Sequence, residues 1–346
     1  MSIFLSLPAG PAFTLDRLHR AGHDAFVVGG CVRDSLAGLV PHDWDICTSA
    51  PPQEICRVFA DIPQALPGIE YGTVTLLLES GPCEVTTFRV EQGYSDGRRP
   101  DGVSFTSRLE EDLARRDFTV NAMALDRDGA VVDPFGGRED LERQVIRCVG
   151  EGDRRFAEDA LRMFRAVRFS AQLGFAVEEH TLAAIRRNAP RAANLSGERI
   201  KAELEKILLS PRPELAGEVL GLGLLSHLGG SPDCPDLLPL RAVPPAPVPR
   251  WREFCRLTGF PITALPVERA LRRGVLHPEA EAVRELALSG GALAALGLEG
   301  EAIGAMQRRL AAHILAHPED NRRERLLQLV EGWRGAQQSP KVGKNA

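Results

Sequence analysis

Strand signals are confined to the first part of this 346-residue chain, and this asymmetry limits its fold more than any other feature. Up to about residue 140, short β-rich runs bounded by Gly, Pro or Asp alternate with helical segments. An Asp128-Gly129 dipeptide predicts a tight hairpin turn near the end of this region. We therefore predict an α+β protein with a mixed sheet in its N-terminal part. The predicted strands are Ala25–Val28, Thr73–Glu79, Glu84–Arg89 and Val120–Leu125.

The rest of the chain has the 3.6-residue period of helices. Residues 232–249 contain seven prolines and predict a linker, after which helices resume near Trp251. We expect a head at residues 1–142, a helical neck at 143–210, and a helical body and tail at 211–346. The best-defined helices are predicted at Phe156–Leu173, Glu179–Asn188, Gly197–Leu209 and Glu214–Leu225.

Composition restricts the location and the partners. The chain is 44% hydrophobic and 26% charged, as in folded proteins. No apolar run approaches the roughly 20 residues that cross a bilayer, and the first residues lack the basic start of a secretory signal. The seven cysteines include no CxxC pair, which argues against a zinc site or a disulfide framework. We expect a cytoplasmic protein without a membrane partner.

Charge is unevenly distributed along the chain. The net charge is −5, yet residues 143–201 contain 12 Lys or Arg against 7 Asp or Glu. Basic side chains supply most of the sequence-independent affinity for a nucleic-acid backbone. This segment therefore predicts an RNA-binding surface, although solvated helix faces would produce the same pattern.

A glycine pair, Gly29 and Gly30, separates a predicted strand from a predicted helix that carries Arg33. Such a turn lets the backbone approach a ligand, and the helix amides and the arginine suit a triphosphate. Asp43 and Asp45 then stand two apart on a predicted strand, so both carboxylates leave the same face. They can share two Mg²⁺ ions, which would activate a hydroxyl nucleophile and stabilise a leaving pyrophosphate.

Glu84 begins the run EVTTFR and is a candidate for a third catalytic carboxylate from a neighbouring strand. Clustered carboxylates are tolerable when cations are bound. The alternative is an edge residue that faces solvent. The chain contains no GxxxxGK[ST], no GxGxxG on a strand-to-helix turn and no GxSxG, so competing phosphate-binding and acyl-transfer chemistries lack their usual marks.

Five motifs follow one another between Phe26 and Phe169. They are GGCVRD…DWD, EVTTFR, RRDFTVNAMA, DPFGGREDL and EDALRMFRAVRF. In order and spacing they resemble class II tRNA nucleotidyltransferases and bacterial poly(A) polymerases. The resemblance implies a polymerase β-type nucleotidyltransferase head, in which Asp43 and Asp45 bind metal while Gly30 and Arg33 hold the triphosphate.

The third motif supplies further candidates for nucleotide binding. The resemblance places Arg116 and Asp117 where relatives contact the sugar and phosphates of the nucleotide. Asn121 follows in the same motif, and a purely structural role for it is an equal alternative.

The fifth motif carries Asp159 and Arg162, which lie side by side if one helix contains both. An aspartate can accept from the amino group of C or A, and a guanidinium can donate to the adjacent ring nitrogen; G and U present the opposite pattern. The resemblance implies that this pair selects the incoming base, and a simple salt bridge is the alternative. Arg165 and Arg168 continue the three-residue step and are predicted to face triphosphate or RNA.

The resemblance implies addition of C, C and A to the 3′ end of tRNA from CTP and ATP. The polar, Gly-rich segment between Arg89 and Arg116 favours full CCA synthesis over partial addition. The alternatives are a poly(A) polymerase, a CC- or A-adding enzyme, and a non-catalytic RNA-binding protein. Intact Asp43 and Asp45 argue against the last of these.

Overall fold

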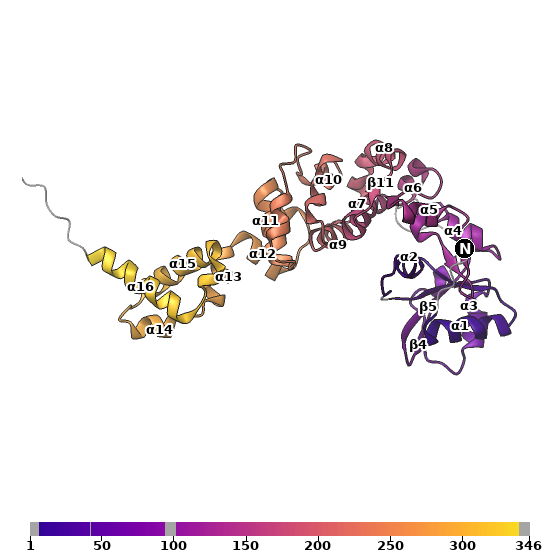
Figure 1. Cartoon of the computed structure of the whole chain (residues 1–346), viewed down its shortest axis with the longest axis horizontal. Helices are drawn as coiled ribbons and strands as arrows, with labels where there is room; N and C mark the ends of the chain where they lie inside the picture. The colour runs from indigo at the N-terminus through magenta and orange to yellow at the C-terminus, as the bar shows by residue number, and fades with distance from the viewer. Residues whose placement is uncertain (1–6, 42, 94–101, 339–346) are drawn as a thin grey trace, which may run out of the picture.

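The computed structural model describes residues 7–41, 43–93 and 102–338. The chain is elongated and curved, with the sheet at one end and the C-terminal helices at the other (Figure 1). The predicted α+β architecture, a mixed-sheet head followed by helices, is confirmed.

The head is built on a seven-stranded sheet of order β3-β4-β5-β2-β1-β8-β9. Strands β2 and β5 pair in parallel and the other neighbours are antiparallel, so the sheet is mixed as predicted. The predicted hairpin joins β8 to β9, with Gly129 at φ 82°. The strands are β1 Ala25–Val28, β2 Asp45–Thr48, β3 Gln64–Ala65, β4 Thr73–Leu78, β5 Gly81–Thr87, β8 Ala124–Leu125 and β9 Val131–Val132.

Both faces of this sheet are buried. Val27 packs into the core under helices α1 Ala9–Arg20 and α3 Pro52–Val58, whereas Val28 packs on the opposite face, near helix α4 Leu109–Ala114. Successive strand side chains point to opposite faces, so one apolar strand supplies both cores. Asp45 and Cys47 share a face for the same reason, which places Asp45 on the α4 side of the sheet.

A two-stranded ribbon extends from the head. Strands β6 Arg89–Gln92 and β7 Gly102–Phe105 pair antiparallel, and helix α4 follows. Part of the Gly-rich segment between Arg89 and Arg116 that favours full CCA synthesis, residues 94–101, lies outside the described residues. That prediction is therefore untested.

The middle of the chain is helical around one buried cluster that runs from Phe118 to Val275 and includes Phe156, Phe164 and Trp251. A short parallel pair, β10 Val145–Ile146 with β11 Ala176–Val177, interrupts the helices. The cluster contains residues from both sides of the predicted neck–body boundary. The helices are α2 Gly30–Leu36 and α5 Gly137–Glu142 at the head, then α6 Gly152–Glu158, α7 Leu161–Leu173, α8 Glu179–Asn188, α9 Gly197–Leu208, α10 Ala216–Gly221, α11 Pro247–Thr258 and α12 Arg269–Leu276.

The expectation of one helix over Phe156–Leu173 is wrong. Helix α6 ends at Glu158, Asp159 is extended at φ −144° and ψ 106°, and α7 begins at Leu161. The Asp159 carboxylate accepts a hydrogen bond from the Leu161 N–H at 2.9 Å, so this N–H bonds a side chain in place of a helical carbonyl.

Two other expected elements are shorter than predicted. Residues 120–125 form the end of a 3₁₀ turn, Thr119–Asn121, before the two-residue strand β8. Helix α10 covers only part of the Glu214–Leu225 prediction, because the chain turns at Gly223 with φ 76°. Helices resume at Pro247, ahead of Trp251, since proline suits the first helical position.

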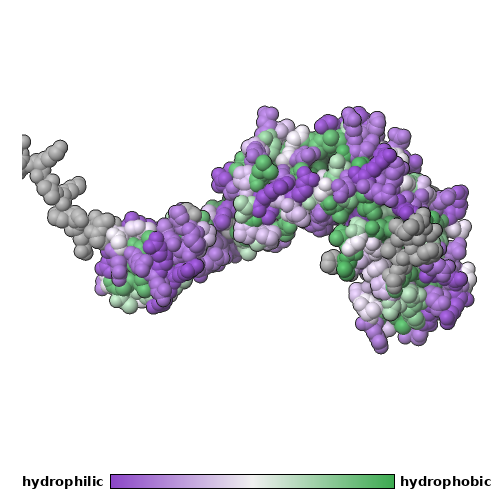
Figure 2. Space-filling model, in the orientation of Figure 1, coloured by the Kyte–Doolittle hydropathy of each residue, from purple (hydrophilic) through white to green (hydrophobic). Residues whose placement is uncertain are grey.

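The C-terminal helices have a core of their own, which is made by Leu288, Leu293, Leu310, Leu326 and Val330 among others. On the face shown in Figure 2, hydrophobic residues form small areas within a mostly hydrophilic surface, as expected when each helix buries one stripe. Among the helices of the described ranges, none is long and apolar enough to cross a bilayer. The C-terminal helices are α13 Pro278–Glu285, α14 Gly290–Ala295, α15 Glu301–Ala316 and α16 Arg323–Gln338.

Because this core is separate, Leu326→Ala is expected to destabilise α13–α16 by about 2–4 kcal/mol and to leave the head unchanged. Leu326 is fully buried, so the substitution leaves a cavity. Hydrogen exchange should speed up in α13–α16 alone. Leu276→Ala, at a half-exposed position, is the control and should change little. Faster exchange throughout the head would contradict independent cores.

Candidate nucleotide-binding site

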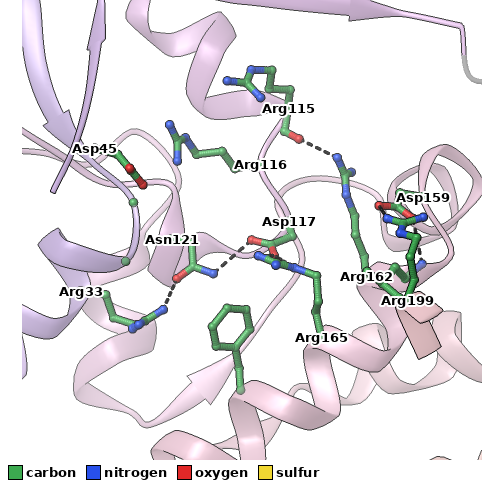
Figure 3. A pocket seen from close by; sticks show the side chains of 14 residues that line it. Arg33, Asp45, Arg115, Arg116, Asp117, Asn121, Asp159, Arg162, Arg165 and Arg199 are labelled. Atoms are coloured by element: carbon green, nitrogen blue, oxygen red, sulfur yellow. Dashed lines mark hydrogen bonds and ion pairs between the residues drawn. The ribbon is translucent and has the colours of Figure 1, made fainter. Parts of the chain in front are cut away.

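A cleft of about 440 Å³ lies where the head meets the neck (Figure 3). The head supplies the Gly29-Gly30 turn and the start of β2. The neck supplies α7 and the first turn of α9. The lining residues are Gly29, Gly30, Arg33, Asp45, Arg115, Arg116, Asp117, Asn121, Asp159, Leu161, Arg162, Arg165, Phe169 and Arg199.

Most of the residues singled out from the sequence meet in this cleft. Within the described chain, Asp43, Glu84 and Arg168 are not part of its lining. Sequence reasoning missed Arg115, Leu161, Phe169 and Arg199 as lining residues. No local signal identifies Arg199, because it reaches the cleft from a different helix and beyond the five motifs. The predicted residues that line the cleft are Gly30, Arg33, Asp45, Arg116, Asp117, Asp159, Arg162 and Arg165.

The glycine turn is required by backbone conformation. Gly29 has φ 92° and ψ −138°, a region that L-residues rarely adopt. A Cβ there would lie 3.1 Å from the Arg116 Nη1. The turn therefore brings bare backbone and Arg116 together at the start of α2. The Nε of Arg116 is buried without a hydrogen-bond partner in the described chain, and its Nη2 donates to Asp112 at 3.4 Å.

A chain of hydrogen bonds crosses the cleft floor from α2 to α7 (Figure 3). The Arg33 guanidinium donates to Asn121 Oδ1, and the Asn121 amide donates to Asp117 Oδ1 at 3.1 Å. The Arg165 Nε donates to Asp117 Oδ2 at 2.7 Å. Asn121 is thus a linking residue of the cleft, between a head arginine and a neck arginine.

Asp117 is the anionic centre of this chain. Burial by itself raises the pKa of its carboxyl, but Arg165 and Asn121 outweigh burial and hold that pKa below its usual range. The carboxylate is therefore ionised at neutral pH, and its charge balances Arg165.

Asp117→Asn is expected to lower the free energy of unfolding by about 1–3 kcal/mol at neutral pH, because Arg165 loses its charged partner. The depressed folded-state pKa means that this stabilisation is present above the unfolded value and is lost as pH falls through the folded value. Urea unfolding of wild type and variant should therefore converge below about pH 4.

The control for this comparison is Asp153→Asn, which removes an exposed ion pair with Arg187. A surface pair contributes little, so its loss should cost well under about 1 kcal/mol. Equal effects of the two substitutions would contradict a special role for the buried pair.

Three carboxylates gather at the head side of the cleft. Asp45 begins β2 and is paired in register with Glu84 of β5. Asp43 precedes the strand, so the expectation that both aspartates lie on one strand is wrong. Asp45 is exposed, but the surrounding protein partly removes its carboxyl from water, and this desolvation raises its pKa. The charges of Glu84 and Asp43 raise that pKa further, whereas Arg116 lowers it.

This arrangement suits a metal ion that takes its remaining ligands from water and substrate phosphate. In the described chain, no three His, Cys, Asp or Glu side chains are placed to hold an ion by themselves. Mg²⁺ in nucleotide sites commonly takes one or two carboxylates and completes its shell with water and substrate phosphate. Asp45 with Asp43 fits that pattern, and a cation there would relieve the repulsion among the carboxylates.

Asp159 and Arg162 are fixed by other groups. Arg199 Nη2 donates to Asp159 Oδ2 at 2.7 Å. Arg162 donates to Glu158 Oε2 at 2.9 Å and to the Arg115 carbonyl at 3.0 Å. In the described chain no ion pair joins Asp159 to Arg162, so the simple salt-bridge alternative is wrong. Both side chains line the cleft with fixed orientations.

Arg168 is directed elsewhere. Its Nε donates to Glu203 at 2.6 Å and its Nη1 donates to Gln172 at 2.8 Å. Burial lowers the pKa of this guanidinium, and Glu203 opposes that effect. The structure thus gives Arg168 internal partners, and its contact with a nucleotide or RNA stays a prediction.

Similar proteins are known by sequence. A family model described as "Poly A polymerase head domain" matches residues 25–147, and one described as "Probable RNA and SrmB- binding site of polymerase A" matches residues 174–228. The CCA-adding enzyme of Geobacillus kaustophilus is 50% identical over 219 residues, which are 62% of this chain and 53% of that enzyme. The CCA-adding enzyme of Limosilactobacillus reuteri is 48% identical over 225 residues, which are 64% of this chain and 55% of that enzyme. The chain spans about half the length of these curated relatives.

Among solved structures, the CCA-adding enzyme of Bacillus stearothermophilus in complex with CTP is 36% identical, with a TM-score of 0.70. The match covers 89% of this chain and 78% of that one. Fold and cleft define the nucleotidyltransferase class that carries a poly(A) polymerase-type head. The chain belongs to the family of CCA-adding enzymes. The resemblance stated from its motifs is confirmed, and the family is metal-dependent in general.

Proposed function

We propose that this chain adds C, C and A to the 3′ end of tRNA from CTP and ATP, without a nucleic-acid template. The observation that carries the proposal is one cleft lined by the carboxylate Asp45, the Gly29–Gly30 turn with Arg33, and the pair Asp159 and Arg162. The relative from Bacillus stearothermophilus, whose solved structure contains CTP, supports it.

Asp43 and Asp45 would hold Mg²⁺ at the head side of the cleft, with Glu84 as a neighbouring catalytic carboxylate. Bound there, the metal would neutralise charge on the triphosphate and lower the pKa of the attacking 3′-hydroxyl. The Gly29–Gly30 backbone, Arg33 and Arg116 bind the phosphates, and Asp117 holds Arg165 toward them. Such fixed positive groups stabilise the charge that develops on the leaving pyrophosphate.

Base selection is assigned to Asp159 and Arg162. Each Asp159 oxygen keeps a second lone pair beyond its present bond, so the carboxylate can accept from the amino group of C or A while Arg199 holds it. The arginine donates to the adjacent ring nitrogen. U and G place a carbonyl where the amino group is needed and would face a carboxylate.

The basic segment at residues 143–201 is proposed to contact the tRNA backbone. In this scheme residues 1–142 are the catalytic head, 143–210 the neck, and 211–346 the RNA-binding body and tail. We assign the protein to the cytoplasm, where tRNA is matured.

The test is to incubate the purified protein with tRNA transcripts that end before CCA, Mg²⁺ and each labelled NTP, singly and together. Products are sized on a gel. Addition of C, C and then A establishes the proposal, and omission of Mg²⁺ should abolish it. Addition that stops after CC, or that requires a CC end, would show a partial enzyme. An absence of any addition would favour a non-catalytic RNA-binding protein.

A poly(A) polymerase is the second candidate, because the matched head and RNA-binding models both describe polymerase A. Both enzymes need the same head and differ in when addition stops. Long A tracts from ATP alone, on tRNA and on unrelated RNA, would identify the polymerase.

A further inference from the structure

We propose that Phe169 is a positioning residue for the phosphate-binding arginines, with its ring holding Arg33 of the head and Arg165 of the neck in place. The inference rests on the proposed use of this cleft for nucleoside triphosphates. Phe169 ends the last of the five sequence motifs, where the sequence offers no reason to separate it from an ordinary core residue.

Three guanidinium groups surround this one ring. Their central carbons lie 5.2 Å (Arg33), 5.3 Å (Arg165) and 4.0 Å (Arg168) from the ring centroid. Cations within about 6 Å of an aromatic face are attracted by the ring quadrupole, more strongly where water is excluded. Phe169 is only 6% exposed and Arg33 is buried, so their contact is largely desolvated, whereas the Arg165 side chain is 35% exposed.

The ring itself is fixed. It packs edge-to-face on Phe118 with centroids 5.8 Å apart and an interplanar angle of 82°. Phe118 is fully buried in the cluster that runs from Phe118 to Val275. A ring anchored in this way cannot follow the arginines if they move, so it defines where they rest.

The ring also completes a closed loop of five residues in contact, here called the circuit. Hydrogen bonds run from Arg33 through Asn121 and Asp117 to Arg165, and both terminal arginines meet again at Phe169. Four of the five members are labelled in Figure 3 with the bonds that join them. Two like charges near one point repel, and here Asp117 and the ring face both oppose that repulsion. Arg168, the third cation, is balanced by Glu203.

The circuit matters for binding because a mobile arginine loses rotamer freedom when it binds a phosphate, and this loss lowers the affinity. Arg33 and Arg165 both line the cleft and are already oriented before any ligand arrives. A triphosphate contacts both, whichever base it carries. Phe169 should therefore affect CTP and ATP equally, and it should affect inorganic triphosphate too.

The test compares two substitutions of the same kind on one helix. Phe169→Leu removes the ring at the arginines, whereas Phe164→Leu removes a fully buried ring that has no described cation contact. Calorimetry then measures binding of inorganic triphosphate, and steady-state assays measure KM and kcat for CTP and ATP on tRNA transcripts.

For Phe169→Leu we expect binding of inorganic triphosphate to weaken by about 10-fold, with matching rises in KM for CTP and ATP and kcat within about twofold. Phe169→Tyr, which keeps the ring, should restore affinity. Phe164→Leu should lower the melting temperature and leave affinity unchanged. If Phe169→Leu does not fold, Phe169→Met, which conserves volume better, replaces it.

Unchanged affinity in Phe169→Leu, an equal loss in Phe164→Leu, an effect on one nucleotide only, or a wild type that does not bind triphosphate would each overturn the inference. A wild type that binds triphosphate as predicted yet adds no nucleotide to RNA would overturn the proposed function and leave the positioning role of Phe169 standing.

Discussion

Asp45→Asn is expected to reduce nucleotide addition by about 10³-fold or more, because the proposed metal site at the head side of the cleft would lose the carboxylate that lines the cleft. The substitution keeps the size of the side chain and removes only its charge. Binding of a tRNA transcript without CCA should be unchanged, since Asp45 lies on the head sheet and the basic segment lies on the neck. Initial rates with labelled CTP and a filter-binding assay measure the two quantities separately.

The stability of this variant provides an independent check. Asp45 shares its surroundings with Glu84 and Asp43, so removal of its charge relieves repulsion in the metal-free protein. The melting temperature in EDTA should equal or slightly exceed that of wild type. Added Mg²⁺ and CTP should raise the melting temperature of wild type more than that of the variant. Asp128→Asn, an exposed position in the β8–β9 turn, is the matched control and should retain full activity. A variant that keeps activity would refute the metal assignment.

Arg162→Ala is expected to raise the use of UTP and GTP relative to CTP and ATP by about 10- to 100-fold, since one well-placed pair of base contacts contributes about 1–3 kcal/mol of discrimination. Single-turnover rates with each NTP on the same transcript give the ratio. The fold should survive, because Glu158 keeps ion pairs with Arg154 and Arg155.

Arg154→Ala is the control for this experiment. Arg154 pairs with the same Glu158 but is largely exposed and does not line the cleft. It should leave nucleotide preference unchanged. If Arg162→Ala keeps wild-type preference, base selection does not depend on this arginine, and the assignment of Asp159 as its partner fails as well.

Local signals predicted local structure well. Strand β1 and helix α8 have the bounds that their periodicity indicates, and the Asp128-Gly129 turn forms the expected hairpin. For helix α8 and the turn the deciding interactions lie within a few residues of the signal, whereas β1 pairs with the distant strands β2 and β8. The helix expected over Phe156–Leu173 failed because the apolar period continues across Asp159, while the extended backbone of Asp159, which the period does not report, ends α6.

The cleft was predictable only where its residues belong to motifs. Asp45, Arg116 and Asp159 were identified because each stands in a recognisable run. Arg199 was not, because its link to Asp159 joins two helices that are distant in sequence. Arg168 and Phe169 show the converse. The three-residue step along the helix predicted that Arg168 faces a ligand, but Arg168 donates to Glu203 of α9, and the neighbouring Phe169 lines the cleft instead.

The break between α6 and α7 frees Asp159 from the geometry of α7. On a continuous helix, the separation of two side chains three residues apart is set by the helical rise and turn. Asp159 has an extended backbone instead, and its carboxylate is held by the Leu161 N–H and by Arg199 of α9. The spacing of the proposed base-reading pair is therefore set by the packing of α9 beside α7, and a change in that packing would alter the spacing without touching either member of the pair.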